Sequence, residues 1–323
     1  MDIRQKLYQM FILGLEGGEY RKALSNGLGG IIFFTKDIQS AKQFWELIAE
    51  MKNLALTPPF FSIDQEGGRV ERTENIHNGK KYLSAKFAYE KGLDFLCHQT
   101  DEIARELKDY GVNMNFAPCI DVNTNPHNPI IGERAFSDKV EDVIKAQKLV
   151  SGVYRKNGII PCVKHFPGHG DANADSHLTL PVIDLSFEEM EQTHIKPFAE
   201  AIKDGIEAVM AAHLHCTCFD RENIPVSLSK NALTYLRERL GFDGVIISDD
   251  MVMKGVAGFG ALQACEEGIR AGLNMFIFRN SNPEVIDVIE KLAKKAQNDI
   301  ELFNKIEDSY SRIIALKKKF MII

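Results

Sequence analysis

The sequence lacks any long, uncharged apolar run. No stretch approaches the ~20 consecutive apolar residues that a helix needs to cross a bilayer. The apolar stretch at residues 7–15 is interrupted by Gln9 and is followed by glutamates and glycines rather than by a small-residue cleavage site. We therefore expect neither a signal peptide nor a membrane partner, and we predict a cytoplasmic protein.

An excess of basic residues is also missing. The 323-residue chain has 45 acidic and 39 basic side chains, which give a net charge of -6. Such a chain has no positive field that would attract a phosphate backbone. We therefore expect no nucleic acid as a partner, and no obligatory protein partner is evident in the sequence.

The six cysteines do not have the compact spacing of a disulfide-rich domain. Several lie inside apolar runs, where a reduced thiol behaves as a small hydrophobic side chain. This distribution favours a reducing compartment, in agreement with a cytoplasmic location. The cysteines are Cys97, Cys119, Cys162, Cys216, Cys218 and Cys265.

Eight short apolar runs of strand length recur along the chain, separated by segments with helical periodicity. The runs are residues 10–13, 30–34, 60–63, 113–117, 160–164, 208–212, 245–248 and 275–278. Residues 93–110 illustrate the helical pattern, because their apolar side chains recur at spacings of three and four before Gly111. Strands that are apolar on both faces and alternate with helices favour a parallel sheet, and eight of them predict a TIM-like (β/α)8 barrel.

No proline-rich linker, low-complexity block or abrupt change of charge divides the chain. We therefore expect residues 1–323 to form a single barrel domain that ends in a helical tail over about 284–323. The tail carries three consecutive lysines at 317–319. We interpret them as compensation of the helix dipole rather than as a site for an anionic partner.

Charged or imidazole side chains follow several of the apolar runs at their C-terminal ends. They are Asp64, Asp121, Lys164, His165, His213, Asp249 and Asp250. In barrel enzymes the loops after the strands converge at this end, above a rigid core. We therefore expect these side chains to point into one pocket.

Residues 164–177 form a polar segment whose glycines and proline favour turns. Three histidines and two aspartates lie in it. One interpretation is a zinc or iron site, although the segment has neither a His-x-x-x-His pair on a helix nor a His-x-His pair on a strand. A second is that Asp175 accepts a hydrogen bond from His177 and fixes its tautomer, so that the ring acts as an acid or base near neutral pH. A third is a loop histidine without a catalytic role.

Two histidines and two cysteines alternate over residues 213–218. Strand alternation places His213 and His215 on one side and the two cysteines on the other, which disfavours a single zinc centre with four ligands. We expect His213 to end its strand in the pocket and to help form the pocket floor.

Two adjacent carboxylates, Asp249 and Asp250, end the apolar run 245–248. Adjacent residues project in different directions, so we expect one to enter the pocket and the other to brace a loop or cap the next helix. Asp64 is followed by a double glycine, which permits a tight backbone course that brings arginines back toward the pocket. An aspartate beside an arginine suits the recognition of hydroxyl and amide groups.

Four motifs occur in order along the chain. They are 63–70 (Ile-Asp-Gln-Glu-Gly-Gly-Arg-Val), 115–118 (Asn-Phe-Ala-Pro) with Asp121-Val122, 164–170 (Lys-His-Phe-Pro-Gly-His-Gly) with 175–177 (Asp-Ser-His), and 244–250 (Gly-Val-Ile-Ile-Ser-Asp-Asp). Together they resemble glycoside hydrolase family 3, specifically its single-domain β-N-acetylglucosaminidase branch. The resemblance extends from the first strand to about Asn280 and implies a TIM-like barrel.

The resemblance also implies an activity, that of a retaining β-N-acetylhexosaminidase. Asp249 would be the nucleophile that forms a covalent glycosyl intermediate, and His177, paired with Asp175, the general acid/base. No metal or organic cofactor is implied, and the substrate is a small carbohydrate, with peptidoglycan (muropeptide) recycling as the implied setting. The residues implied to bind the N-acetylglucosamine ring are Asp64, Arg72, Arg134, Lys164 and His165.

Several alternatives stay open at this point. A phosphorylase is the nearest, because a neutral histidine does not repel an incoming phosphate dianion. A β-glucosidase of the same fold is a second alternative. Family relatives that cleave glucosides, however, usually take the acid from a second domain, and here the sequence indicates only a helical tail after the barrel. Outside the family, the candidates are a sugar-binding barrel without catalysis and a metal-dependent barrel hydrolase. The latter would use His165, His169, His213 and His215.

One segment departs from the family pattern. Residues 251–253 read Met-Val-Met, where Leu-Ser-Met or Leu-Asn-Met is expected. This difference bears on contacts to the leaving sugar and not on the nucleophile.

Overall fold

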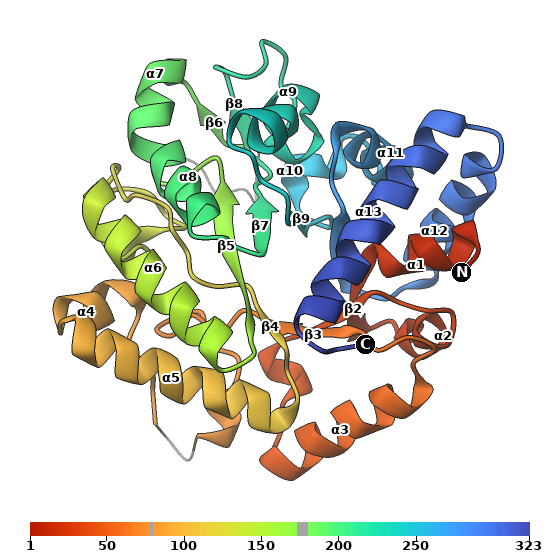
Figure 1. Cartoon of the computed structure of the whole chain (residues 1–323), viewed down its shortest axis with the longest axis horizontal. Helices are drawn as coiled ribbons and strands as arrows, with labels where there is room; N and C mark the ends of the chain where they lie inside the picture. The colour runs from red at the N-terminus through yellow and green to blue at the C-terminus, as the bar shows by residue number, and fades with distance from the viewer. Residues whose placement is uncertain (78–79, 173–179) are drawn as a thin grey trace.

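Eight parallel strands close into a barrel in the computed structural model, which describes residues 1–77, 80–172 and 180–323 (Figure 1). The order of the strands around the barrel is β1-β10-β9-β7-β5-β4-β3-β2. Each of the eight predicted apolar runs is one of these strands, so the predicted (β/α)8 barrel is confirmed. The strands are β1 (Phe11–Glu16), β2 (Gly30–Phe33), β3 (Phe60–Ile63), β4 (Met114–Asn115), β5 (Ile160–Phe166), β7 (Ala208–Ala211), β9 (Val245–Asp250) and β10 (Met275–Asn280).

Helices surround the barrel and cover its outer face (Figure 1). The α-helices are α1 (Ile3–Gln9), α2 (Tyr20–Ser25), α3 (Ala41–Leu54), α4 (Ala85–Glu90), α5 (Leu93–Tyr110), α6 (Val140–Lys156), α7 (Phe187–Glu189), α8 (Lys196–Lys203), α9 (Lys230–Thr234), α10 (Lys254–Ala257), α11 (Ala261–Ala271), α12 (Pro283–Ala296) and α13 (Ile300–Lys319). Shorter 3₁₀ segments are Thr35–Asp37, Glu74–Ile76, Gly132–Arg134 and Val226–Leu228, and π-helical segments are Met190–Ile195 and Tyr235–Arg239.

The predicted helix at 93–110 is α5, and its apolar face packs inward. Leu96, Ile103 and Leu107 are buried. The helix ends at Gly111, whose φ of 89° lies in the left-handed region and whose N–H donates to the carbonyl of Leu107. A side chain other than glycine would be strained there, which explains why the sequence signal for the end of this helix is reliable.

The C-terminal tail is two helices rather than one. It breaks after α12, and Asp299 then caps α13 by accepting a hydrogen bond from the N–H of Leu302. The first helix, α1, packs against both α12 and α13, so the N-terminal helix lies beside the two C-terminal helices (Figure 1).

Two strands lie outside the barrel and were not predicted. β6 (Val182–Ile183) and β8 (His215–Cys216) form a small parallel sheet, in which Ile183 pairs with Cys216. Strands of two residues are too short to show an alternating pattern, so the sequence carried no signal for them.

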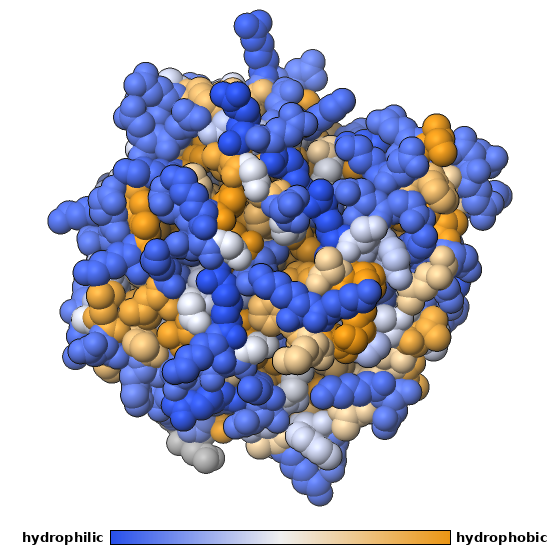
Figure 2. All heavy atoms as spheres, in the orientation of Figure 1, coloured by the Kyte–Doolittle hydropathy of each residue, from blue (hydrophilic) through white to orange (hydrophobic). Residues whose placement is uncertain are grey.

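The surface is largely polar. Figure 2 shows hydrophilic side chains over most of the face drawn, with apolar side chains in small separate groups. Among the residues that the structure describes, no helix has both the length and the apolar character needed to cross a membrane.

Lys317 lies inside the protein rather than at the surface. Its ammonium group is buried near the N-terminal end of the barrel, where it donates to the side-chain oxygen of Gln9 (2.7 Å) and to the carbonyl of Pro58 (2.8 Å) and lies 5.0 Å from the ring centroid of Phe60. No carboxylate among the described residues forms an ion pair with it. Burial lowers the pKa of Lys317 to about 7.

This pKa predicts a pH-dependent stability. Between pH 7 and about 10 the unfolded chain holds a proton on Lys317 that the folded chain releases, so the free energy of unfolding rises with pH, by at most about 1.4 kcal/mol per pH unit. Urea unfolding at several pH values should show a smaller rise for Lys317→Met than for the wild type. Lys318→Met, at an exposed position, is the matched control and should behave as the wild type. Equal pH slopes in all three proteins would contradict the prediction.

Candidate active site

A cavity of about 650 Å³ opens at the C-terminal ends of the barrel strands. Six residues predicted to bind the sugar or to act on it lie in the described part of the chain, and all six border the cavity, from β3, β5, β9 and the loops between them. These residues are Asp64, Arg72, Arg134, Lys164, His165 and Asp249. The predicted pair Asp175 and His177 lies outside the described residues.

Lys164 projects from β5 and is bound by two carboxylates. Its ammonium nitrogen lies 2.7 Å from Asp64 and 2.6 Å from Glu66, and the side chain is only 2% exposed. Burial alone would lower the pKa of Lys164, but the two carboxylates raise it above its usual value. The lysine is therefore a permanent cation in the wall of the cavity.

Glu66 also holds Arg134 in a bidentate ion pair. The Nε and Nη2 atoms of Arg134 lie 2.9 and 2.8 Å from the two carboxylate oxygens of Glu66. Although burial raises the pKa of Glu66, the charges of Arg134 and Lys164 hold it well below its usual range. Sequence reasoning gave Glu66 no role. The sequence did contain an indirect indication of this residue. Two cations were predicted for one pocket, and buried cations require a carboxylate beside them.

The loop after β3 is folded back toward the cavity by its backbone contacts. The side-chain oxygen of Gln65 accepts from the N–H of Arg72 (2.7 Å), and the N–H of Gln65 donates to Asn115 (2.9 Å). Gly67 has a φ of 92°, and a Cβ there would lie 2.3 Å from the carbonyl oxygen of Leu83. The tight course expected from the double glycine is present, and it brings Arg72 to the cavity.

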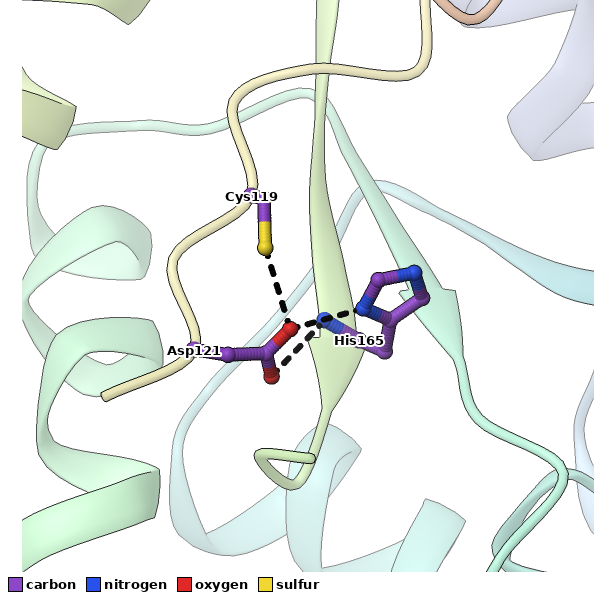
Figure 3. Close-up of side chains that lie close together, drawn as sticks. All are labelled: Cys119, Asp121 and His165. Atoms are coloured by element: carbon purple, nitrogen blue, oxygen red, sulfur yellow. Dashed lines mark hydrogen bonds and ion pairs between the residues drawn. The ribbon is translucent and has the colours of Figure 1, made fainter. Parts of the chain in front are cut away.

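His165 is fixed by a buried carboxylate that sequence reasoning placed at the pocket without a role. Asp121 lies 2.7 Å from Nδ1 of His165 and also contacts the thiol of Cys119 at 3.1 Å (Figure 3). The Nη2 atom of Arg134 lies 3.3 Å from Nε2 of His165. Because a guanidinium can only donate, Nε2 accepts, and the proton of the neutral ring is on Nδ1, where it is donated to Asp121.

Cys119, Asp121 and His165 bring three types of metal ligand within 4.8 Å of one another. Figure 3 shows, however, that the thiol and the imidazole both point at the carboxylate. Burial raises the pKa of Cys119, which disfavours the thiolate that a metal requires, and the cation of Arg134 borders the same ring. The arrangement therefore fits a hydrogen-bonded support for His165 better than a metal centre.

The other histidines of the metal alternative do not converge. Nδ1 of His213 contacts Ser227 at 2.7 Å, and Nδ1 of His215 contacts the carbonyl of Ile224 at 3.3 Å. His213 does not border the cavity as expected, because it is buried, with its carbonyl oxygen and Cβ next to Gly255. His169 does border it, and neither of its ring nitrogens has a partner in the described part of the protein. Burial, together with His165, lowers the pKa of His169 to about 4.

The two adjacent carboxylates at the end of β9 have different surroundings. Asp250 is hydrogen-bonded to the backbone and side chain of Arg279 and to the N–H of Val252, so it braces the loops beside the cavity. Asp249 borders the cavity and accepts from the N–H of Asp250 at 2.7 Å. Although burial raises the pKa of Asp249, the neighbouring His165, His213 and Lys164 hold it below its ordinary value. A carboxylate ionised at neutral pH therefore faces the cavity.

Arg72 is a cation without a carboxylate partner among the described residues. Its guanidinium lies 5.9 Å from the ring centroid of Phe34, and its buried Nε atom has no hydrogen-bond partner. The cavity thus offers free donors as well as the carboxylates of Asp64 and Asp249. Such a combination suits a ligand rich in hydroxyl and amide groups.

Residues 2–316 match the model of the Glycosyl hydrolase family 3 N terminal domain. A beta-hexosaminidase of Methylococcus capsulatus is 34% identical over 275 residues, which cover 83% of this chain and 80% of that protein. A beta-hexosaminidase A of Pseudoalteromonas piscicida is 31% identical over 319 residues, covering 90% of this chain and 53% of that protein.

Among solved structures, a glycoside hydrolase family 3 beta-N-acetylglucosaminidase of Paenibacillus superposes with a TM-score of 0.92 at 30% identity. The superposition covers 100% of this chain and 63% of that one. The chain therefore spans about half the length of the Pseudoalteromonas relative and less than two thirds of the Paenibacillus enzyme.

The ion pairs of Glu66 predict that neutralising its carboxylate strongly destabilises the folded protein. Glu66→Gln leaves Lys164 and Arg134 buried without their shared counter-charge, and it should lower the free energy of unfolding by about 3–5 kcal/mol. Glu74→Gln removes the same charge from an exposed position of the same loop. This variant should change the free energy of unfolding by less than about 0.5 kcal/mol. Urea unfolding of both variants tests the prediction. Equal stability of the two would contradict it.

Proposed function

The chain belongs to glycosyl hydrolase family 3, and we propose that it hydrolyses terminal β-linked N-acetylglucosamine with retention of configuration. The observation that carries this proposal is the ionised carboxylate of Asp249, which faces a cavity lined by fixed donors and acceptors. The relatives described as beta-hexosaminidases, and the Paenibacillus beta-N-acetylglucosaminidase, support the choice of sugar.

In the proposed mechanism, a carboxylate of Asp249 attacks the anomeric carbon while His177 protonates the oxygen of the leaving sugar. The covalent glycosyl ester is then cleaved by water, from which His177 removes a proton. Asp175 would hold the imidazole in the required tautomer. The roles of His177 and Asp175 rest on the Asp-Ser-His motif at 175–177. Every step uses side chains of the protein and requires no metal or organic cofactor.

The sugar ring would be held by groups that are already fixed before it binds. Asp64 is held by Lys164, and Arg134 by Glu66, so neither side chain has to be ordered by the ligand. Asp64 can accept from ring hydroxyls, while Arg72 offers a donor that has no protein partner in the described part of the chain. Preorganisation of this kind favours stabilisation of the transition state.

The setting that we propose is the recycling of cell-wall fragments in the cytoplasm, with residues 1–323 acting as one barrel domain. A muropeptide carries N-acetylglucosamine next to an acidic sugar, and the rim of the cavity carries several cations. They include Arg69 and Arg72, together with Lys36 and Arg279, which are ion-paired with Glu16 and Asp250.

The same cations favour a second candidate, a phosphorylase, in which phosphate replaces water in the second step. Product analysis in the presence and absence of phosphate separates the two, because a phosphorylase releases the sugar 1-phosphate and a hydrolase releases the free sugar.

The proposed role of Asp249 as the nucleophile predicts that the Asp249→Asn variant no longer hydrolyses the glycoside. We expect hydrolysis of an aryl β-N-acetylglucosaminide to fall by at least about 10⁴-fold, because the amide cannot act as the nucleophile. The wild type should cleave this substrate in preference to the matching aryl β-glucoside. Retained binding of N-acetylglucosamine shows that the variant is folded. A variant that keeps more than a tenth of the wild-type turnover would remove Asp249 from this role.

The role of His177 predicts an effect that depends on the leaving group. His177→Ala should impair a natural disaccharide at least about 100-fold more than a dinitrophenyl glycoside, because the dinitrophenolate leaves without protonation. The kcat values for the two substrates measure this ratio. Equal losses on both substrates would exclude His177 as the general acid.

A further inference from the structure

Two cysteines that the proposed mechanism does not use lie side by side at the end of β8. The sulfur atoms of Cys216 and Cys218 are 3.3 Å apart. Cys216 is buried, with 1% of its surface exposed, whereas Cys218 is partly exposed. The pair therefore joins a buried cysteine to a partly exposed one.

The two thiols differ in acidity. A hydrogen bond from Cys216 lowers the pKa of Cys218, and the same hydrogen bond, together with burial, raises the pKa of Cys216. A partly exposed cysteine with a lowered pKa is the type that reacts with oxidants, because the thiolate is the nucleophile.

The remaining cysteines have no such arrangement. Cys119, Cys162 and Cys265 are buried, and burial raises the pKa of each. Cys97, on α5, is partly exposed, but no other sulfur is hydrogen-bonded to it in the described part of the chain. Cys97 is therefore an internal control, because it is a partly exposed cysteine without a second thiol hydrogen-bonded to it.

We propose that Cys216 and Cys218 are a reversible redox site, which hydrogen peroxide converts to an intrachain disulfide that lowers turnover. The thiolate of Cys218 attacks the peroxide, so that an S–O bond forms, the O–O bond breaks, and the leaving hydroxide takes up a proton. The sulfur of Cys216 then attacks the sulfenic acid of Cys218: the S–S bond forms, the S–O bond breaks, and hydroxide leaves with the thiol proton as water. Two thiols and one peroxide give one disulfide and two waters.

The disulfide strains the contact between β8 and β6. The sulfur atoms must approach from 3.3 Å to about 2.05 Å. Thr217, the residue between them, is anchored to β6 and its neighbour: its N–H donates to the carbonyl of Ile183 (3.1 Å), and its hydroxyl donates to Asp184 (2.7 Å). Formation of the disulfide should therefore shift Thr217 and disturb these two hydrogen bonds.

The effect on turnover rests on the proposed function. β8 is also tied to the chain before β6, because the N–H of His215 donates to the carbonyl of Pro181 (2.8 Å), four positions after His177 in sequence. Asp249 belongs to β9, which does not pair with β6 or β8. We therefore expect oxidation to impair the acid step more than the attack by the nucleophile.

The disulfide is tested by titrating the purified protein with hydrogen peroxide and counting free thiols. The count should fall from six to four, with a loss of about 2 Da in the peptide that contains residues 216–218, and dithiothreitol should restore both. In the Cys97→Ser variant, peroxide should still oxidise the thiols of Cys216 and Cys218. The Cys216→Ser variant should form no intrachain disulfide. Survival of the pair while Cys97 is oxidised, or conversion of Cys218 to a sulfinic acid without a bridge, would overturn the proposal.

The switch is tested on the same samples by hydrolysis. Oxidation should lower kcat for a disaccharide at least about fivefold, lower it less for a dinitrophenyl glycoside, and be reversed by dithiothreitol. The double variant Cys216→Ser/Cys218→Ser should be active and insensitive to peroxide. Formation of the disulfide without a change in kcat would overturn the switch. If the untreated protein hydrolysed neither substrate, the proposed function and the switch would both fail, while the thiol count would still decide on the disulfide.

Discussion

The carboxylate of Glu66 is the interaction on which the site depends. It lies within 3 Å of both the ammonium of Lys164 and the guanidinium of Arg134, and all three side chains are nearly excluded from solvent. These groups come from three different parts of the barrel rim, namely the loop after β3, strand β5 and the loop before α6. Without Glu66, Arg134 would be a buried cation with no carboxylate partner and Lys164 would keep only Asp64, at a cost of several kcal/mol. Glu66 therefore fixes the relative positions of three loops and keeps positive charge in the cavity at any physiological pH.

The remaining parts of the site are built around this fixed charge. Arg134 borders His165, so the imidazole is held between a donor on one side and Asp121 on the other, which settles its tautomer. The cations and histidines in turn keep Asp249 ionised at the end of β9. The cavity is thus ordered before a ligand arrives, and the ionised carboxylate of Asp249, which we propose as the nucleophile, faces fixed hydrogen-bonding groups. This arrangement favours glycoside chemistry that uses side chains alone.

The sequence predicted correctly those features of the fold and the site that depend on a local pattern of residues. Apolar runs located all eight barrel strands, and polar residues at their ends, such as Asp64 and Asp249, were correctly placed at one cavity because parallel strands end at the same rim. Long-range pairing could not be predicted. Glu66 is 68 residues from Arg134 and 98 residues from Lys164, and Asp121 is 44 residues from His165. Spacing alone does not reveal which of these charges meet. The sheet of β6 and β8 was missed for the same reason, since its strands are stabilised by each other and not by a local pattern.

The central claim is that Asp249 forms a covalent bond to the sugar. Its most direct test is to trap that intermediate with a fluorinated aryl N-acetylglucosaminide whose glycosyl ester is hydrolysed slowly, and to map the modified residue by mass spectrometry of a peptic digest. We predict one sugar per chain, attached to the peptide that contains residues 244–250 and, by fragmentation, to Asp249. A sugar attached to another residue, or turnover of the reagent without any covalent adduct, would contradict the claim.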